Sequence, residues 1–304
     1  METANTFWAR LRGLIGRRGL PPGAGLLIPR CNAIHTCFMR FAIDATFLDG
    51  AGRPVRVVRN IRPWRFFVWG GWRARAVLET PVRTVLVTGG TTRLGKAIAD
   101  HLRAEGWRVL TTSHRADAGA DIVADFTDPD APARVFAEAR RLLGGFPPAA
   151  LVNNAALFTG DAATLQAVNV AAPRALTALM AAETPHDAAW RGAVVNILDT
   201  RVLGDAPPPG VYAATKTALK EATHADAARC AATLRVNAVA PGPVLAPVGV
   251  HEKAAATPLG RPTPADVARA VAFLLSARAT TGTILPVDGG ASLVQQSSVS
   301  RPPA

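Results

Sequence analysis

Beyond residue 83, short β-branched runs alternate with alanine-rich stretches whose apolar residues recur at helical spacing. The predicted strands are Thr84–Thr88, Arg108–Thr112, Ile122–Ala124, Ala150–Asn153, Ala193–Ile197, Arg235–Ala238 and Thr283–Val287. Helical patterns begin near Leu94, Pro132, Ala163, Pro209 and Pro264. Such alternation is typical of a parallel sheet covered by helices on both faces. We therefore predict an α/β fold with one doubly wound parallel sheet over residues 81–294.

The first 80 residues follow a different pattern. Residues 42–58 read as two strands joined by a turn at Asp49–Gly52, which predicts a β-hairpin. The alternation that begins at Val55 would place Val55 and Val57 inward and Arg56 outward. We predict a small β-rich module over residues 1–80, and a disordered Ser- and Pro-containing tail over residues 295–304.

The basic charge is concentrated in this first module. The chain has 49% apolar residues and a net charge of +12, and residues 1–80 hold 13 arginines, no lysine and 4 acidic residues. A basic surface first suggests nucleic acid, but arginines along a hairpin are typical of a solvated face, so we expect no nucleic-acid partner. A non-catalytic dinucleotide-binding protein whose basic module engages RNA or an acidic partner is an alternative, and it predicts steeply salt-dependent binding.

Three cysteines cannot form a disulfide framework in a chain of 304 residues, which favours a reducing compartment. No apolar run approaches the roughly 20 residues of a spanning helix, so we expect a soluble, cytoplasmic protein without a membrane partner. Cys31, His35 and Cys37 form a C-x3-H-x-C cluster that could suggest zinc. A fourth ligand is not evident, and we favour packing roles and no metal.

A glycine-rich turn follows the first predicted strand of the α/β region. Thr88–Gly95 reads TGGTTRLG and leads into a helix, whose N-terminus offers free N–H groups to an anion. Strand, glycine turn and helix together predict a Rossmann-type dinucleotide site. The residues expected to contact the cofactor in this turn are Gly89, Thr92, Arg93, Leu94 and Gly95.

The second strand predicts which nicotinamide cofactor binds. NAD sites usually carry an acid at its end, whereas this chain has Ser113, His114 and Arg115 there. Arg115 and Arg93 could pair with a 2′-phosphate, which favours NADP(H), unless both are ordinary surface residues. Asp125, which precedes Phe126 after the third strand, could accept a hydrogen bond from adenine or cap the local turn.

Tyr212, the only tyrosine of the chain, precedes Lys216 by four residues. On a helix both side chains lie on one face and can address the same reacting group. A phenol titrates near 10, so a neighbouring cation is needed to bring its pKa towards neutral. The pair can then supply the acid that hydride transfer requires beside the atom gaining negative charge.

From about Val82 to Leu293 the chain resembles the short-chain dehydrogenase/reductase family. The motifs that carry this resemblance occur in order and are TGGTTRLG at 88–95, Asn153–Ala156, Asn169, Tyr212 with Lys216, Pro241-Gly242 and Val287–Gly290. The resemblance implies that Tyr212 donates a proton, that Lys216 lowers its pKa and holds the nicotinamide ribose, and that Asn169 anchors a water. It also implies cofactor contacts from Asn154, Ala155, Pro241 and Gly242, and a homodimer or homotetramer built through helices around 163–180 and 212–232.

Three departures resemble the pteridine reductase branch of that family. Arg93 replaces the middle glycine of the turn, Ala156 ends the NNA motif, and Asp199 stands where a catalytic serine is expected, 13 residues before the tyrosine. In that branch a phenylalanine four residues after the second Asn of NNA stacks on the pterin, and Phe158 occupies this position. The resemblance thus implies a pteridine substrate.

The chemistry of Asp199 agrees with this branch. A carboxylate beside a developing alkoxide opposes ordinary carbonyl reduction, whereas reduction of a C=N bond needs a proton at nitrogen. We therefore predict hydride transfer from NADPH to a dihydropterin or dihydrofolate, with Tyr212 and Asp199 as the proton-delivery pair. An NADPH-dependent ketone or 3-oxoacyl reductase is the alternative, and a degenerate site is a further one.

Two other segments complete the sequence picture. Residues 26–49 resemble a small bacterial β-domain family of unknown function, which implies a compact β fold and no assigned activity. Because the next module begins almost at once after residues 75–79, we interpret the copy as incomplete. Residues 243–262 lack clear periodicity and are predicted to form a loop that closes over the substrate.

Overall fold

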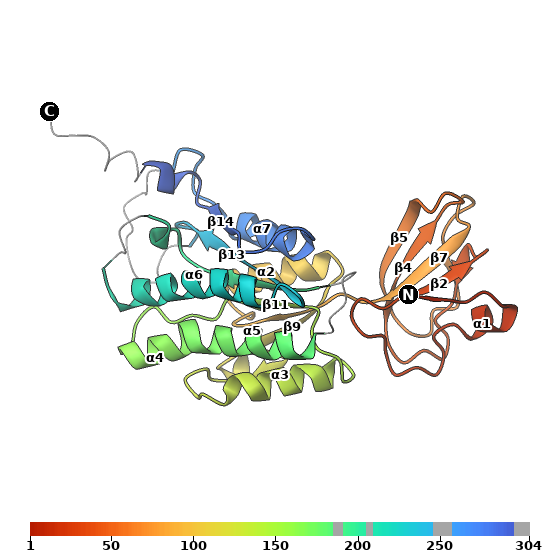
Figure 1. Ribbon diagram of the computed structural model, residues 1–304, viewed down its shortest axis with the longest axis horizontal. Coiled ribbons are helices and arrows are strands. Elements are labelled where there is room, and N and C mark those ends of the chain that lie inside the picture. Colours follow the sequence, from red (N-terminus) through yellow and green to blue (C-terminus); the bar gives the residue numbers. More distant parts are fainter. Residues whose placement is uncertain (185–190, 205–208, 246–256, 295–304) are drawn as a thin grey trace. The chain divides into compact units, whose positions relative to one another are not determined.

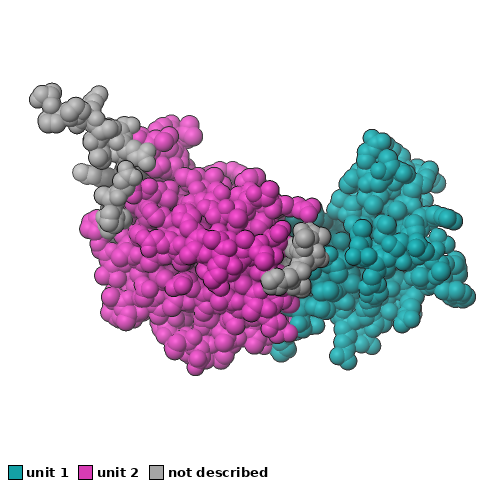
Figure 2. Space-filling view, viewed as in Figure 1, with its two compact units in different colours: residues 1–84, 106–108, 141–146 teal, residues 85–105, 109–140, 147–304 magenta. Residues whose placement is uncertain are grey.

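The computed structural model describes residues 1–184, 191–204, 209–245 and 257–294. These residues form two compact units, shown in different colours in Figure 2. The first unit comprises 1–84 with 106–108 and 141–146, and the second comprises the remainder. Within the described ranges, no helix is both long enough and apolar enough to cross a membrane. The predicted tail at 295–304 and most of the predicted loop at 243–262 lie outside the described residues.

A seven-stranded parallel sheet forms the centre of the second unit (Figure 1). Its strands are β8 (Thr84–Val87), β9 (Arg108–Ser113), β10 (Ile122–Val123), β11 (Ala150–Asn153), β12 (Gly192–Ile197), β13 (Leu234–Pro241) and β14 (Ile284–Val287). They are ordered β10-β9-β8-β11-β12-β13-β14. The order reverses between β8 and β11, the point at which ligands bind in sheets of this kind. The predicted doubly wound fold is confirmed.

Helices cover both faces of this sheet. They are α2 (Arg93–Ala104), α3 (Ala131–Leu142), α4 (Ala162–Gln166), α5 (Ala172–Glu183), α6 (Val211–Arg229) and α7 (Pro264–Ser276), with a π-helical turn at Ala167–Ala171 and short 3-10 turns at Ala116–Ala118 and Thr200–Val202. Helices α2 and α7 pack on each other, and Figure 1 shows α5 and α6 on the near side of the sheet. The strands β12 and β13 are buried throughout, as expected for strands covered on both faces.

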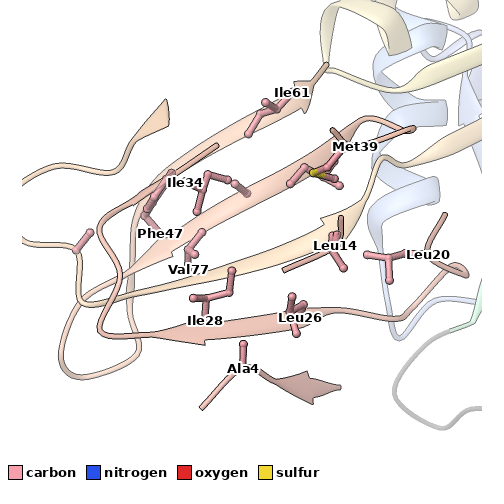
Figure 3. Packing of buried hydrophobic residues seen from close by; sticks show 13 residues of the cluster. Ala4, Leu14, Leu20, Leu26, Ile28, Ile34, Met39, Phe47, Ile61 and Val77 are labelled. Carbon is pink, nitrogen blue, oxygen red and sulfur yellow. The ribbon is translucent and has the colours of Figure 1, made fainter. Parts of the chain in front are cut away.

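The first unit contains a five-stranded sheet ordered β1-β2-β7-β4-β5 and a two-stranded β3-β6 ladder. Its elements are β1 (Glu2–Thr3), α1 (Phe7–Arg12), β2 (Leu26–Pro29), β3 (Ala33–Ile34), β4 (Ile43–Leu48), β5 (Pro54–Ile61), β6 (Val68–Trp69) and β7 (Ala76–Pro81). The antiparallel pair β4 and β5 confirms the predicted hairpin. Figure 3 shows the apolar core of this unit, in which Phe47 and Val77 are completely buried.

The predicted alternation on β5 is wrong at Val57, whose side chain is 46% exposed. The pairing of β4 with β5 shifts register between Phe47 and Leu48 and again between Ile43 and Ala45. An extra residue in one strand turns the following side chains to the opposite face. Val55 and Val58 therefore pack against the core, and Val57 faces outward.

The cysteines of this unit make backbone contacts. The Cys31 thiol donates to the carbonyl oxygen of Ala33 at 2.9 Å, and the Cys37 thiol contacts the carbonyl oxygen of Arg65 at 3.9 Å. Among the described residues, no group of three or more His, Cys, Asp or Glu side chains could hold a metal ion. Cys31, His35 and Cys37 thus do not converge on one point.

Candidate active site

Tyr212 and Lys216 lie one helical turn apart near the start of α6. The Lys216 side chain is 3% exposed. Its Nζ donates to the carbonyl oxygen of Ile197 at the end of β12, at 2.8 Å, and lies 5.8 Å from the centre of the Tyr212 ring. Burial lowers the pKa of Lys216 to about 8, and the charge of Asp199 partly offsets this effect. The helix and the strand end therefore hold an ammonium group next to the tyrosine at neutral pH.

Asp199 follows β12 and caps the 3-10 turn at Thr200–Val202. The Asp199 carboxylate accepts three hydrogen bonds from Arg201, whose backbone N–H donates at 2.9 Å, whose Nε donates at 3.0 Å and whose Nη2 donates at 2.7 Å. A two-pronged pair of this kind fixes the direction of the carboxylate as well as its charge. The Arg201 guanidinium carbon lies 5.4 Å from the centre of the Tyr212 ring. Asp199, Arg201 and Tyr212 form one group, which we term the acid-arginine-tyrosine cluster.

This environment raises the pKa of Tyr212 above that of a free phenol. Burial is the largest cause, the negative charge of Asp199 adds to it, and the positive charge of Arg201 opposes it. The family resemblance implied that Lys216 lowers the pKa of this tyrosine, whereas in the structure burial dominates and the Lys216 Nζ donates to the Ile197 carbonyl oxygen. The phenol carries its proton at neutral pH, as a proton donor must.

Phe158 lies against the tyrosine. The two rings stack with centroids 4.8 Å apart and planes 25° apart, and Phe158 remains 66% exposed. The segment is held by Asn169, which lies in the π-helical turn. Its Oδ1 accepts from the N–H of Leu157 at 2.8 Å and its Nδ2 donates to the Leu157 carbonyl oxygen at 2.9 Å. Asn169 and Phe158, predicted separately from the sequence, are thus linked through one residue of backbone.

The glycine turn after β8 is closely packed. A Cβ added to Gly95 would lie 2.1 Å from the carbonyl oxygen of Gly89, so only glycine fits there. Asn154 Nδ2 donates to the carbonyl oxygens of Thr88 and Gly89 at 3.0 and 3.1 Å. The backbone N–H groups of Asn154 and Ala155 donate to the Thr88 hydroxyl. The NNA motif therefore braces the turn at the point where the strand order reverses.

Arg93 begins α2 with a φ of 49°, in the left-handed region that favours glycine. This is the position at which the family commonly has glycine. Its neighbours Thr92 and Leu94 are exposed and half-buried. A non-glycine residue in this region costs about 1 kcal/mol or more. Arginine is thus retained here against a local conformational preference, next to the free N–H groups of the helix.

The end of β9 carries an ion pair that the sequence reasoning missed. His114 and Arg115 are both exposed, and Arg115 Nε and Nη2 donate to the two carboxylate oxygens of Asp117 at 3.0 and 2.6 Å. Both partners of this pair are solvated, so it contributes little stability and can be exchanged for another anion. No acidic residue stands at the strand end itself.

Asp125 Oδ1 accepts the N–H of Thr127 at 2.9 Å, which holds the pKa of that carboxyl below its ordinary value. The turn-capping alternative is therefore present in the structure, and Phe126 beside it is buried.

At the other end of the sheet, Pro241 ends β13 and Gly242 follows it. A Cβ on Gly242 would lie 2.7 Å from the Cα of Asp288, so this turn also requires glycine.

Known proteins share the sequence and the fold of the second unit. Residues 90–292 match the protein family described as enoyl-(acyl carrier protein) reductase. The chain belongs to the short-chain dehydrogenase/reductase family. Ketoacyl reductase 2 of the granaticin polyketide synthase of Streptomyces violaceoruber is 34% identical over 249 residues, which are 71% of this chain and 98% of that protein. L-xylulose reductase of Caenorhabditis elegans is 31% identical over 246 residues, 69% of this chain and 96% of the relative.

Solved structures of short-chain reductases are similar as well. FolM alternative dihydrofolate reductase 1 from Brucella suis, in complex with NADP, has a TM-score of 0.60 and 32% sequence identity, over 69% of this chain and 95% of that one. Residues 1–90 match a separate family described as uncharacterized ACR. This second match agrees with the resemblance of residues 26–49 to a bacterial domain family of unknown function.

The main site residue of this short-chain reductase that the sequence reasoning missed is Arg201. It lies two residues after Asp199, and the Asp-x-Arg spacing at the start of a tight turn is a usable signal for such a pair. Thr88 was also missed, although its hydroxyl accepts two of the N–H groups of the NNA motif. Both residues act by holding other site residues in place.

Proposed function

We propose that this short-chain reductase uses NADPH to reduce a C=N bond of a pteridine of the dihydropterin or dihydrofolate type. The observation that carries the proposal is the acid-arginine-tyrosine cluster, in which a carboxylate replaces the expected serine. Arg201 turns the Asp199 oxygens into fixed acceptors beside the tyrosine. A pterin ring carries N–H donors for such acceptors, whereas a ketone does not.

The residues around the glycine turn fit an NADP(H) molecule. The tight approach of Gly95 to Gly89 and the start of α2 suit a pyrophosphate, and β9 ends without the acid that would repel a 2′-phosphate. Arg93 and Arg115 are the proposed partners of that phosphate, and Arg115 would exchange Asp117 for it. Asn154 and Ala155 border the same turn, Pro241 and Gly242 at the end of β13 are further proposed contacts of the cofactor, and Lys216 would hold the nicotinamide ribose. Bound NADPH would supply the hydride.

Proton delivery rests on the residues of the chain. Reduction of C=N adds a hydride to carbon and a proton to nitrogen, and Tyr212 Oη, whose phenol is protonated at neutral pH, is the proposed donor of that proton. The phenolate left behind is stabilised by the Arg201 and Lys216 cations until solvent returns the proton. Asp199 would orient the pterin by accepting hydrogen bonds from the N–H groups of the pterin ring. The exposed ring of Phe158 offers a stacking surface. Asn169 positions that surface through Leu157.

Reduction of a ketone or a 3-oxoacyl thioester is a second candidate. It is favoured by the similarity to the granaticin ketoacyl reductase, and Arg201 neutralises part of the carboxylate charge that would oppose an alkoxide. In that reaction, however, the carbonyl group of the substrate offers no hydrogen-bond donor, so the Asp199 carboxylate would accept no hydrogen bond from it.

The two candidates are separated by steady-state oxidation of NADPH with matched substrates. We expect turnover with dihydrobiopterin or dihydrofolate and none with an acetoacetyl thioester, and the reverse result would reject the pteridine proposal. Replacing Asp199 by Asn keeps its shape and removes its charge, and we expect about a hundredfold loss of kcat/KM with the pteridine. The variant Arg174→Gln changes an exposed arginine of α5 outside the cluster and should keep wild-type kinetics.

The variant Asp199→Ser further separates pteridine reduction from carbonyl reduction. It restores the residue that ordinary carbonyl reduction uses, so the pteridine proposal predicts loss of pteridine turnover. A gain of pteridine turnover in this variant would contradict a role for the carboxylate. Circular dichroism of each variant checks that the fold is intact.

A further inference from the structure

The first unit contains a cavity that the reductase chemistry does not use. It has a volume of about 280 Å³ and lies between α1, the strands β2 and β3, and β7. Its walls include Leu14, Ile28, Ile34 and Met39, which Figure 3 shows gathered in the apolar core of this unit. This volume is near the lower end of the range of small-molecule sites. The apolar wall suits a compact hydrocarbon group.

A buried carboxyl group, that of Glu79, lines this cavity. In β7, Val77 and Glu79 both point to the core, and Glu79 lies opposite Leu26 of β2 and Ala45 of β4. Glu79 therefore stands where the pattern calls for an apolar residue. Its side chain is 3% exposed and makes no hydrogen bond or ion pair with another described residue. Buried carboxyl groups are costly without such a partner.

A second unsatisfied polar atom lies in the same wall. Nδ1 of His35 is buried and has no hydrogen-bond partner among the described residues. Native structures leave few buried polar atoms unsatisfied, and those that remain call for an explanation such as a ligand. Glu79 and His35 thus both line the cavity, and each carries a buried polar group without a partner among the described residues.

The mouth of the cavity is cationic. Arg10 and Arg12 of α1 and Arg30 after β2 line it, and their side chains make no ion pair within the part of the chain that the structure describes. Arg30 adopts a φ of 54°, which non-glycine residues seldom hold. Burial raises the pKa of the Cys31 thiol, the negative charge of Glu79 adds to this effect, and the positive charge of Arg10 opposes it. A carboxyl group and guanidinium groups therefore line the same small cavity.

We propose that this cavity binds a small amphoteric molecule of the α-amino-acid class with an apolar side chain. Its ammonium group would contact Glu79, its carboxylate would pair with Arg10 and the neighbouring arginines, and its side chain would fill the apolar wall. A pure amine would leave the arginines unpaired, and a pure acid would leave Glu79 without a donor. The site would be independent of the NADPH-dependent reaction.

The test titrates the full-length protein with three matched probes by isothermal titration calorimetry. These are L-leucine, isocaproate, which is leucine without the ammonium group, and isoamylamine, which is leucine without the carboxylate. We expect leucine to bind about tenfold more tightly than either analogue, because each analogue leaves a charged group unpaired. Absence of leucine binding at millimolar concentration, or equal affinity for all three probes, would overturn the proposal.

Two variants assign the groups. Glu79→Gln should weaken leucine about tenfold and leave isocaproate unchanged, whereas Arg10→Gln should weaken leucine and leave isoamylamine unchanged. Arg53→Gln, in the turn of the β4-β5 hairpin and outside the cavity lining, is the control and should bind leucine like the wild type. Unchanged leucine affinity in Glu79→Gln would reject the assignment. If a variant does not fold, the three-probe comparison on the wild-type protein still decides.

Discussion

Arg93 combines a disfavoured backbone conformation with a position at the start of α2. Replacing it by glycine removes the conformational cost of about 1 kcal/mol and also removes the guanidinium. We predict that Arg93→Gly keeps or raises the unfolding temperature and raises the KM for NADPH about tenfold, with little change in the KM for NADH. Initial-rate kinetics with both cofactors and a thermal melt measure these effects. An equal rise in KM for both cofactors would argue against a contact with the 2′-phosphate.

The pKa of Lys216 predicts the pH above which activity is lost. Its folded-state pKa of about 8 lies below the ordinary lysine value, so the ammonium is present below that pH and is lost as the pH rises through it. We therefore expect kcat/KM to fall above about pH 8 rather than near pH 10, because the cation beside Tyr212 disappears. Stability should move the other way and rise between about pH 8 and 10, because the unfolded lysine binds the extra proton.

The pH profile of NADPH oxidation checks this prediction. Lys220, one turn further along α6, donates to the carbonyl oxygen of Val202, and Lys220→Met is the matched control that should keep the same alkaline limit. A profile that stays flat to about pH 10 would show that the Lys216 ammonium is not required.

At the residue scale, the sequence led to the residues proposed for the site but not to all of their contacts. Tyr212, Lys216, Asp199 and Phe158, each proposed from the sequence, are neighbours in the structure. The pairing of Arg201 with Asp199 depends on the backbone of a 3-10 turn, and the capture of Lys216 by Ile197 depends on where β12 ends. Neither backbone position is encoded in residue spacing alone, and neither is the burial of Tyr212, which is the main reason why its pKa is raised.

At the scale of elements, β7 carries a prediction about stability. Burial raises the pKa of Glu79 to about 7, so the folded state keeps a proton that the unfolded state has lost above its pKa of about 4.5. Stability is therefore lost as the pH rises from about 4.5 to about 7, by up to about 3 kcal/mol. Glu79→Gln should abolish this loss.

Urea unfolding followed by tryptophan fluorescence measures it, since four of the six tryptophans lie in residues 1–80. The wild-type midpoint should fall between about pH 4.5 and 7 and then level off, while that of Glu79→Gln stays level throughout. Parallel curves for the two proteins would show that another group causes the dependence.

The elements themselves follow from the sequence to different degrees. The strands of the second unit match their predicted spans within a few residues, and the central strands β8, β11, β12 and β13 are short, largely buried apolar runs of the kind that the sequence reveals. The sequence predicted that the last of these strands ends at Ala238, whereas β13 extends to Pro241. The prediction stopped early because Ala and Pro at the end of the strand carry no strand signal of their own. In the first unit the hairpin was predictable, but the pairing of β7 with both β2 and β4 joins segments distant in sequence. Such pairings and the register shifts of β5 have no local signature.

At the scale of the whole molecule, the two proposed sites fall in different units. A ligand that binds the folded state stabilises the structure that holds it, by about 3 kcal/mol at a hundred times its Kd. We predict that NADPH slows hydrogen exchange in peptides from the 85–105 and 147–184 ranges, whereas L-leucine slows it in peptides from residues 7–39 and 76–81. Hydrogen exchange with mass spectrometry measures both. Protection by L-leucine at the glycine turn would reject the separate site.

Strand β5 lies at the edge of the five-stranded sheet, and its arginines affect whether this edge can pair with another molecule. Unpaired strand edges invite a strand from another molecule, which leads to aggregation. Along β5 the two register shifts interrupt the edge, and Arg56 and Arg59 add charge to it. An incoming strand would have to desolvate these guanidinium groups, and charged side chains on an edge strand oppose pairing for this reason. The two arginines of β5 thus protect this edge against self-association.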